Sequence, residues 1–319
     1  MDQEALRVTE RRRIGSSDLM VSPVGLGAWA WGSRFFWSYG RTHSRGDISA
    51  AWRRSLELGV NLVDTAEIYG IGRSERIIGE LLREQRDEVV IATKYMPVTL
   101  TSRAIRRAAE GSLGRLGIKE IDLYQVHFPY PLHSMRATLR EMEHLVREGK
   151  VRYIGVSNFS AAQVEAARSA LAREDVVSDQ VHYNIIHRKP ELVGLTEYAR
   201  KERVGIIAYS PLAQGVLTDK YSPHHRPGGM RRFMPKFSNR RLGRVAPLVE
   251  ELRRIGGQHG RTTSQVALAW LLRDPNVVVI PGAKNAEQAA LNAGAAGLAL
   301  SAAELESIEG SCRDCGMLA

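Results

Sequence analysis

The stretch Val89-Val-Ile-Ala-Thr-Lys94 is a short apolar, β-rich run that ends in a lysine. Two further runs of this kind end in Asp64 and in His127, and Tyr69 follows shortly after Asp64. An acid, a phenol, an amine and an imidazole at strand ends can form one proton-transfer site if the strands lie side by side. The arrangement of the strands therefore decides whether these residues act together.

Apolar runs of strand type alternate along the chain with amphipathic helical stretches. We predict strands at residues 24–28, 62–63, 89–93, 123–126, 151–156, 177–181, 205–209 and 277–280. We predict helices at residues 48–58, 74–83, 103–116, 135–148, 161–170, 191–203, 263–272 and 286–293. The chain thus repeats a strand followed by a helix.

The strand runs are short and continuously apolar, as expected when both faces of a parallel sheet are covered. Eight such units in 319 residues fit an α/β protein with the (β/α)8 TIM-barrel fold. A doubly wound sheet is the alternative, and it normally carries G-x-G-x-x-G after its first strand. Here Gly25-Leu-Gly27-Ala-Trp-Ala30 lacks the third glycine, which favours the barrel.

Four segments do not fit the plain repeat. Residues 9–21 are expected to form an N-terminal β-hairpin that caps the barrel bottom, and residues 301–310 an extra C-terminal helix. The aromatic segment 29–46 and the basic, Gly- and Pro-rich segment 213–239 follow strands, so in a barrel they open on the catalytic face. Such long loops are lids or binding loops, or else disordered. Without a low-complexity linker, we predict a single domain, 1–319.

The composition is that of a soluble globular protein, with 44% hydrophobic and 25% charged residues. No apolar run approaches the roughly 18 residues that a membrane helix needs. The start of the chain has no signal-peptide core, so a cytoplasmic location is the default expectation.

The formal net charge is +10, and the segment from Lys220 to Arg244 holds eight Lys or Arg and no Asp or Glu. Such a patch attracts nucleic acid, an anionic cofactor or an acidic substrate. Because no aromatic-basic platform or nucleic-acid motif accompanies it, a phosphate-bearing small molecule is the preferred partner. A merely solvated loop is the alternative.

The two cysteines form Cys312-Arg-Asp-Cys315 near the end of the chain. A CxxC motif can be a redox pair or half of a metal site. Here no strand precedes it, and neither a second pair nor a histidine cluster accompanies it. We interpret the cysteines as two incidental thiols and predict no metal site.

In a parallel barrel, the strand ends at Asp64, Lys94 and His127 are neighbours on one rim, and Tyr69 joins them from a loop. A nearby ammonium favours the phenolate and lowers the pKa of tyrosine from about 10. A carboxylate keeps that ammonium charged, and a neutral imidazole can orient a carbonyl oxygen. Taken singly, each residue could instead have a structural role. Asp64 could cap a helix, His127 could be a hydrogen-bonded rim residue, and Tyr69 could pack against its neighbours.

Ordered motifs from about residue 12 to about residue 307 resemble the aldo-keto reductase family. They are Gly25-Leu-Gly27, Asp64-Thr-Ala-Glu-Ile-Tyr-Gly70, Ala92-Thr-Lys94, Asp122-Leu-Tyr-Gln-Val-His127, Gly155-Val-Ser-Asn158, Gln180-Val-His-Tyr-Asn184, Tyr209-Ser-Pro-Leu212 and Ile280-Pro-Gly-Ala-Lys-Asn285. The resemblance implies a (β/α)8 barrel that transfers hydride between NAD(P)H and carbonyl compounds without a metal. It implies that Tyr69 is the general acid, tuned by Lys94 and Asp64, and that His127 orients the substrate.

The resemblance also implies a binding site for NADPH. Ser157, Asn158 and Gln180 match the residues that hold the nicotinamide carboxamide, and Tyr209 matches the aromatic ring that stacks on the nicotinamide. The loop that passes the pyrophosphate would contribute Ser210, Leu212, Gly215 and Leu217, with Lys220 adding charge.

At the far end of the cofactor, Gly282 would admit close backbone approach, and Gln288 and Asn292 would contact the adenosine. Lys284 matches the basic residue placed for the 2′-phosphate, which favours NADPH over NADH. Asp219 departs from the family pattern, because relatives commonly have glycine there. A carboxylate beside the pyrophosphate is unfavourable unless it points away.

The aromatic insert resembles that of a branch which reduces pyridoxal and other aromatic aldehydes. Its candidate substrate residues are Trp29, Trp31, Phe36 and Trp37. The leading hypothesis is therefore an NADPH-dependent reductase of aryl or pyridoxal-type aldehydes. One alternative is a regulatory subunit of a potassium channel that uses bound NADP(H) as a sensor. The other is nucleic-acid binding, which rests on charge alone.

Overall fold

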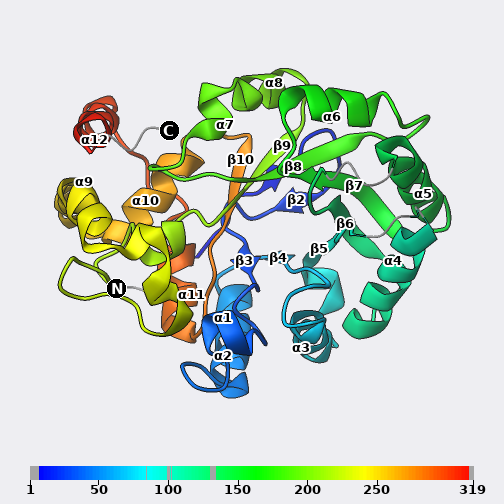
Figure 1. Ribbon diagram of the computed structural model, residues 1–319, viewed down its shortest axis with the longest axis horizontal. Helices are drawn as coiled ribbons and strands as arrows, with labels where there is room; N and C mark the ends of the chain where they lie inside the picture. Colours follow the sequence, from blue (N-terminus) through cyan, green and yellow to red (C-terminus); the bar gives the residue numbers. More distant parts are fainter. Residues whose placement is uncertain (1–6, 84, 99–100, 102, 130–133, 316–319) are drawn as a thin grey trace.

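The computed structural model describes residues 7–83, 85–98, 101, 103–129 and 134–315. Its centre is a parallel sheet of eight strands that curls into a barrel (Figure 1). The strands are β3 (Leu26–Gly27), β4 (Leu62–Asp64), β5 (Val90–Tyr95), β6 (Ile121–Val126), β7 (Val151–Ser157), β8 (Val176–His182), β9 (Gly205–Tyr209) and β10 (Val277–Ile280). They pair in chain order, and backbone hydrogen bonds from Gly25 to Val279 and from Gly27 to Pro281 join the two ends. The predicted barrel is confirmed.

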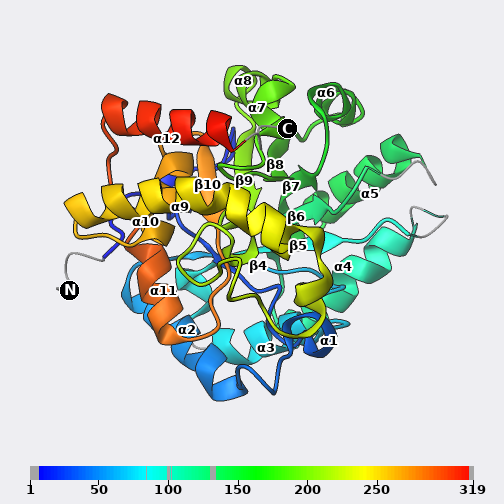
Figure 2. The ribbon, with the colours of Figure 1, turned by 60° about the vertical axis from the view of Figure 1, so that its left-hand side comes forward.

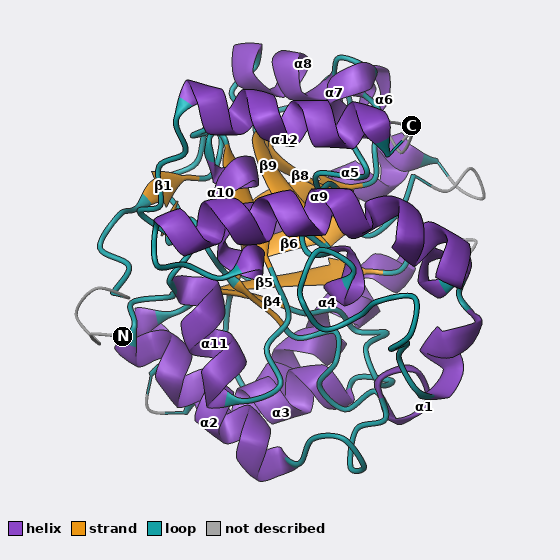
Figure 3. Ribbon diagram, turned by 90° about the vertical axis from the view of Figure 1, so that its left-hand side faces the viewer, coloured by secondary structure: helices purple, strands orange, loops and turns teal. Residues whose placement is uncertain are grey.

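Helices enclose the strands on the outside (Figure 3). Those that follow barrel strands are α2 (Arg45–Glu57), α3 (Arg73–Leu82), α4 (Arg103–Leu116), α5 (Met135–Arg147), α6 (Ala161–Arg168), α7 (Lys189–Leu192), α8 (Leu195–Lys201), α10 (Thr263–Leu272) and α11 (Ala286–Ala293). A short 3-10 helix, η2 (Arg86–Glu88), precedes β5. The single helix expected at residues 191–203 is two helices, because Gly194 adopts a φ of 72° between α7 and α8.

The structure contains a long helix that the sequence analysis missed, α9 (Asn239–Gln258). Its buried residues recur three or four positions apart, at Leu242, Val245, Leu248, Val249, Leu252 and Ile255. Pro247 and several arginines interrupt this pattern and concealed it. Figure 2 shows α9 beside α10 and the extra C-terminal helix α12 (Ala302–Asp314). The predicted C-terminal helix is thus present, and it packs on α9.

The predicted hairpin is also present, as the antiparallel pair β1 (Arg12–Arg13) and β2 (Met20–Val21). Ile14 and Leu19 from this hairpin pack with Leu123 and Val177 of the barrel interior. The Arg12 guanidinium donates to backbone oxygens beside β10, including that of Val277 at 2.8 Å. Apolar side chains therefore close the bottom of the barrel, and the opposite end is left for a site.

Two long loops lie at that opposite end. The loop after β3 contains α1 (Arg34–Trp37). The loop after β9 contains three 3-10 helices, η3 (Ala213–Gly215), η4 (Gly229–Phe233) and η5 (Pro235–Phe237). Both loops follow the carboxyl ends of their strands, where TIM-barrel enzymes place their active sites. Within the described ranges, no helix has the length and apolar character needed to cross a bilayer.

Candidate active site

A cavity of about 420 Å³ opens between these loops at the carboxyl ends of the strands. Its lining combines residues from the β3 and β4 ends with the loop after β9 and the segment after β10. Of the predicted site residues, it includes Trp29, Trp37, Asp64, Tyr69, Gln180, Tyr209, Ser210, Leu212, Gly215, Gly282, Lys284, Gln288 and Asn292.

A larger, more open hollow of about 950 Å³ lies at the other end of the barrel, where β5 and β6 begin. Several of its charged side chains neutralise one another. The Asp122 carboxylate contacts Arg86 at 2.8 Å and Arg152 at 3.2 Å. Because none of the predicted site residues lines this hollow, we place the candidate site in the smaller cavity.

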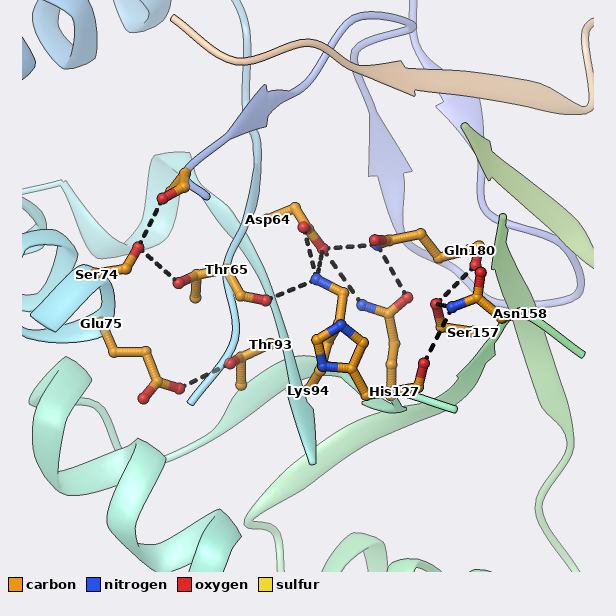
Figure 4. Close-up of polar contacts among 12 residues, drawn as sticks. Asp64, Thr65, Ser74, Glu75, Thr93, Lys94, His127, Ser157, Asn158 and Gln180 are labelled. Carbon is orange, nitrogen blue, oxygen red and sulfur yellow. Dashed lines mark hydrogen bonds and ion pairs between the residues drawn. The ribbon is translucent and has the colours of Figure 1, made fainter. Parts of the chain in front are cut away.

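At the floor of the cavity, the Lys94 ammonium is held by the Asp64 carboxylate (Figure 4). Lys94 Nζ lies 2.6 Å and 2.8 Å from the two Asp64 oxygens and donates to the Thr65 carbonyl oxygen at 2.7 Å. The lysine side chain is fully buried. Burial lowers the pKa of Lys94, and the attraction of Asp64 partly offsets this effect. The adjacent strands β4 and β5 thus place a charged pair beneath the cavity.

Two amides complete the coordination of Asp64. Gln180 Nε2 donates to Asp64 Oδ2 at 2.7 Å, and Gln125 Nε2 lies 3.4 Å from the same oxygen. Gln125 was not predicted as a site residue. Its position in β6, paired with Lys94 in β5, indicated that its side chain could share the barrel interior. The carboxylate is therefore held by polar groups from β5, β6 and β8.

Tyr69 and His127 lie above this pair. Lys94 Nζ is 5.2 Å from the centre of the Tyr69 ring, and the His127 ring lies edge-on to Tyr69 with centres 6.0 Å apart. Burial, followed by the nearby Lys94 charge, lowers the pKa of His127 to about 3. His127 is therefore neutral near pH 7. Its buried Nδ1 has no hydrogen-bond partner among the described residues.

The pKa of Tyr69 differs from the sequence-based expectation. Lys94 was expected to lower it, but burial of the phenol raises the pKa well above its usual range, with further contributions from Asp64 and Tyr209. Burial is the largest cause, and the Lys94 charge, which is paired with Asp64, does not offset it. Tyr69 is thus a protonated phenol in the protein alone, able to donate its proton when negative charge develops nearby.

The residues predicted to hold the nicotinamide form a chain of hydrogen bonds. Ser157 Oγ donates to the Gln180 carbonyl oxygen at 2.7 Å, and Asn158 Nδ2 donates to Ser157 Oγ at 3.0 Å. The Tyr209 hydroxyl donates to Asn158 Oδ1 at 3.0 Å. Ser157 and Asn158 stand behind the cavity lining, whereas Gln180 and Tyr209 face it.

Tyr209 has a support that the sequence analysis did not identify. The His182 ring stacks on Tyr209, with centres 5.3 Å apart and planes 12° apart. Asn184 Nδ2 lies 3.2 Å from His182 Nε2 and donates to the Ser210 carbonyl oxygen at 3.0 Å. Because Asn184 Oδ1 accepts from Ile186 N, its amide nitrogen is the donor and His182 Nε2 the acceptor. These contacts fix the Tyr209 ring and the start of the following loop.

In that loop, Ser210, Leu212 and Gly215 reach the cavity, but the Leu217 side chain is fully buried in the core. The Asp219 carboxylate is held by Arg253 at 2.8 Å and by the Thr263 hydroxyl at 2.7 Å. These partners in α9 and α10 offset the negative charge that the sequence analysis found unfavourable beside a pyrophosphate.

Cations gather at the outer end of the cavity. Lys220, Arg231 and Lys284 all belong to its lining. Burial, together with the positive charges of Arg231 and Lys220, lowers the pKa of Lys284 to about 8. Arg231 Nε is buried and has no hydrogen-bond partner within the described structure. This end of the cavity suits a polyanion.

Comparison with known proteins identifies the family. The model of the aldo/keto reductase family matches residues 23–312. The chain belongs to the aldo/keto reductase family. The reductase is 43% identical to an uncharacterised oxidoreductase of Mycobacterium tuberculosis, over 92% of this chain and 90% of that protein. It is 32% identical to the chloroplastic pyridoxal reductase of Arabidopsis thaliana, over 95% of this chain and 86% of that protein.

Solved structures agree with this assignment. The structure of an aldo-keto reductase from Klebsiella pneumoniae in complex with NADPH superposes on the reductase with a TM-score of 0.77. That protein is 28% identical, and the match covers 95% of each chain. The family resemblance found in the sequence and the barrel fold are both confirmed.

The aromatic insert of the reductase divides into two parts. Trp29 stacks on Phe36, with centres 5.1 Å apart, and lies 6.3 Å from the Tyr69 ring. Trp31, however, is fully buried in the core, where its indole nitrogen donates to the Ala283 carbonyl oxygen at 2.8 Å. Trp31 therefore lies outside the cavity lining, and its hydrogen bond joins the insert to the segment after β10.

The cysteines of the reductase are not part of the cavity lining. Cys312 and Cys315 are buried thiols at the end of α12. Burial raises the pKa of Cys312 to about 12, so its thiol is unreactive at neutral pH. Among the described residues, no group of three or more His, Cys, Asp or Glu could hold a metal ion.

Proposed function

We propose that this chain is an NADPH-dependent oxidoreductase that reduces aldehydes or ketones to alcohols. The observation that carries the proposal is the buried Lys94–Asp64 pair directly beneath a protonated Tyr69. A buried ion pair is costly unless its geometry and hydrogen bonds are good, so its position at the cavity floor favours a functional role.

The cavity residues match the parts of NADPH. The polar chain through Gln180 and Tyr209 suits a carboxamide and a flat ring, and the cations at Lys284 and Arg231 suit phosphates. The unsatisfied Arg231 Nε is the group that an anion would complete. When bound, the nicotinamide supplies the hydride that the carbonyl carbon receives.

The protein groups would then handle the carbonyl oxygen. The neutral His127 imidazole orients the oxygen through a hydrogen bond, and Tyr69 donates its proton as the oxygen gains negative charge. The Lys94 ammonium, 5.2 Å from the centre of the Tyr69 ring and paired with Asp64, is the cation that faces the phenolate that remains. His127, with a pKa of about 3, is too weak a base to remain protonated at neutral pH, which leaves Tyr69 as the acid.

We also propose an aryl or pyridoxal-type aldehyde as the substrate. Trp29, stacked on Phe36, presents an aromatic surface beside Tyr69. A flat ring can stack on such a surface, with ring centres about 4.5–7 Å apart. The similarity to the Arabidopsis pyridoxal reductase supports this class of substrate.

The proposal is tested by following NADPH oxidation with aryl aldehydes, pyridoxal, methylglyoxal and simple sugars. We expect turnover with the aryl aldehydes or pyridoxal. Tyr69→Phe should reduce kcat by at least about 100-fold, the scale of general acid catalysis, and leave the Kd for NADPH nearly unchanged. Turnover by the Tyr69→Phe variant at the wild-type rate would contradict the assigned acid, and no turnover of any carbonyl by the wild type would contradict the function.

A further inference from the structure

Trp37 connects the phosphate end of the cavity to its aromatic end. Lys284 Nζ and the Arg231 guanidinium carbon each lie 4.7 Å from the centre of the Trp37 ring. Trp37 also lies edge-on to Trp29, with centres 5.2 Å apart, and to Phe36, with centres 5.3 Å apart. One indole thus touches both the proposed phosphate ligands and the proposed aryl platform.

The Trp37 ring packs against the hydrophobic core cluster that includes Trp31 and Ile48. Its indole nitrogen is buried and has no hydrogen-bond partner in the described part of the chain. The ring is therefore positioned by packing alone, against the core, its aromatic neighbours and the two cations. A cation held over an aromatic face is attracted to it, and more strongly when the pair is shielded from water. A change at either cation should consequently reach the aromatic insert.

The cations, in contrast, are held by their own segments. Arg231 donates to the Gln214 carbonyl oxygen at 2.5 Å and to the Tyr221 hydroxyl at 3.2 Å. The backbone nitrogen of Lys284 donates to Gln288 Oε1 at 3.0 Å. Trp37 belongs to α1, so the indole brings together the loop after β3, the loop after β9 and the segment after β10.

Repulsion between the cations opposes this assembly in the protein alone. Arg231 and Lys220 both disfavour the charge on Lys284. The Asp219 carboxylate is paired with Arg253 and Thr263. A phosphate that contacts Lys284 would offset the repulsion and fix both cations in their places beside Trp37.

We propose that Trp37 is a specificity-determining residue that couples recognition of the cofactor 2′-phosphate to binding of an aryl carbonyl at Trp29 and Phe36. The proposal rests on the proposed function and deepens it. The complex with the 2′-phosphorylated cofactor binds the aryl substrate more tightly than the complex with the unphosphorylated cofactor. By thermodynamic reciprocity, the bound aryl substrate increases the affinity for the 2′-phosphorylated cofactor more than the affinity for the unphosphorylated one.

Oxidised cofactors allow a test without turnover. The Kd of 4-nitrobenzaldehyde is measured by calorimetry with the wild type saturated with NADP+ and, separately, with NAD+. We expect the Kd to be at least about fivefold lower with NADP+, the lower end of typical coupling between sites. Equal Kd values with NADP+ and with NAD+ in the wild type would overturn the proposal, and no variant is needed for that conclusion.

Substitutions locate the coupling. Trp37→Leu should bring the ratio of the two Kd values close to one. A merely structural loss of the pocket would raise both Kd values and leave the ratio unchanged, which would also refute the role of Trp37. Phe35→Leu is the matched control, because Phe35 is the neighbouring aromatic of α1 and is 79% exposed. It should keep the wild-type ratio.

The outcome is separable from that of the proposed function. If the wild type reduces aryl aldehydes with NADPH but shows equal Kd values with the two oxidised cofactors, only the coupling fails. If the wild type reduces no carbonyl compound at all, the proposed function fails first.

Discussion

Lys284 is the residue on which the preference for NADPH should depend. A dianionic 2′-phosphate has no counterpart in NADH, so Lys284→Ala should weaken NADPH binding far more than NADH binding. Because burial and neighbouring cations lower the pKa of Lys284 to about 8, its charge is lost as the pH rises above that value. The ratio of the NADH Kd to the NADPH Kd should therefore fall between pH 7 and pH 9.

Lys284→Arg provides the control, since a guanidinium keeps its charge throughout this range. The variant should show a ratio that is nearly independent of pH. Equal losses of both cofactors in Lys284→Ala would refute the phosphate assignment. Fluorescence titration with each cofactor gives the Kd values.

Asp179 is a buried carboxyl group beside the proposed nicotinamide site. Its Oδ1 accepts a long hydrogen bond from Phe159 N, 3.5 Å away, and its Oδ2 has no partner in the described chain. Burial raises the pKa of Asp179 to about 8, so the folded protein keeps this group neutral near pH 7. The unfolded chain, with a pKa of about 3.9, is ionised there.

Folding therefore takes up a proton at Asp179 between about pH 4 and pH 8, and this group makes the protein less stable as the pH rises. Asp179→Asn removes that proton uptake. Relative to the wild type, the variant should gain several degrees in melting temperature when the pH is raised from 5 to 7.5. A difference that stays constant across this range would show that Asp179 is ionised in the folded state.

At the residue scale, the sequence predicted that Asp64, Lys94 and His127 lie together, because each ends an apolar run and a parallel barrel brings strand ends together. Their catalytic roles stay a prediction. Residues inside strands were harder to recognise. Gln125 and His182 alternate with core residues, and nothing local distinguishes a polar side chain facing a site from one facing a neighbouring helix. The raised pKa of Tyr69 depends on burial and on which charges are already paired, and both need coordinates.

Among the elements, helix α3 packs closely on the end of α4 through Gly79. A methyl group at Gly79 would lie 2.6 Å from the Arg115 carbonyl oxygen and 2.7 Å from that of Leu116. Gly79→Ala should therefore destabilise the protein by about 1–3 kcal/mol, the usual cost of overpacking. Chemical denaturation provides the measurement.

Gly114 offers the matched control, since it also lies inside a helix and a methyl group there would meet nothing within 4 Å. Gly114→Ala should stabilise the protein by about 0.5–1 kcal/mol, because alanine loses less backbone entropy than glycine. Equal effects of the two substitutions would contradict the close packing of α3 on α4.

Element prediction failed where local signals conflicted. Helix α9 has an apolar stripe of the right spacing, but Pro247 and the basic residues around it interrupt the stripe, and no helix was predicted there. Burial against α10 and α12 outweighs those unfavourable residues, and that burial is a tertiary effect. The loops of the site were located correctly from their length and composition, whereas the 3-10 helices within them left no recognisable pattern.

For the whole molecule, the seam that closes the barrel contains one narrow contact. A methyl group at Gly27 would lie 2.6 Å from the Ile280 carbonyl oxygen, in the seam between β3 and β10. Gly27→Ala should separate the seam and lower the unfolding free energy by about 1–3 kcal/mol. The chain is predicted to be a single domain. We therefore propose that the lower unfolding free energy of Gly27→Ala is seen as the shift of one cooperative unfolding transition.

Gly282 is the control for the seam. A methyl group there meets only the Gly27 carbonyl oxygen, at an ordinary 3.6 Å, yet Gly282 lines the cavity. Gly282→Ala should leave the unfolding free energy within about 0.5 kcal/mol of the wild-type value. If both substitutions lowered the unfolding free energy by similar amounts, the seam would be no tighter at Gly27 than at Gly282.

The same seam bears on how the protein is made. The cavity takes part of its lining from Gly27 and part from Asn292, which are close to opposite ends of the described chain. During synthesis on the ribosome, the first of these emerges long before the second. A nascent chain therefore has no complete binding site until nearly all of its helices have been translated. Cofactor in the cell stabilises the completed barrel by mass action, but it cannot assist the earlier stages of folding.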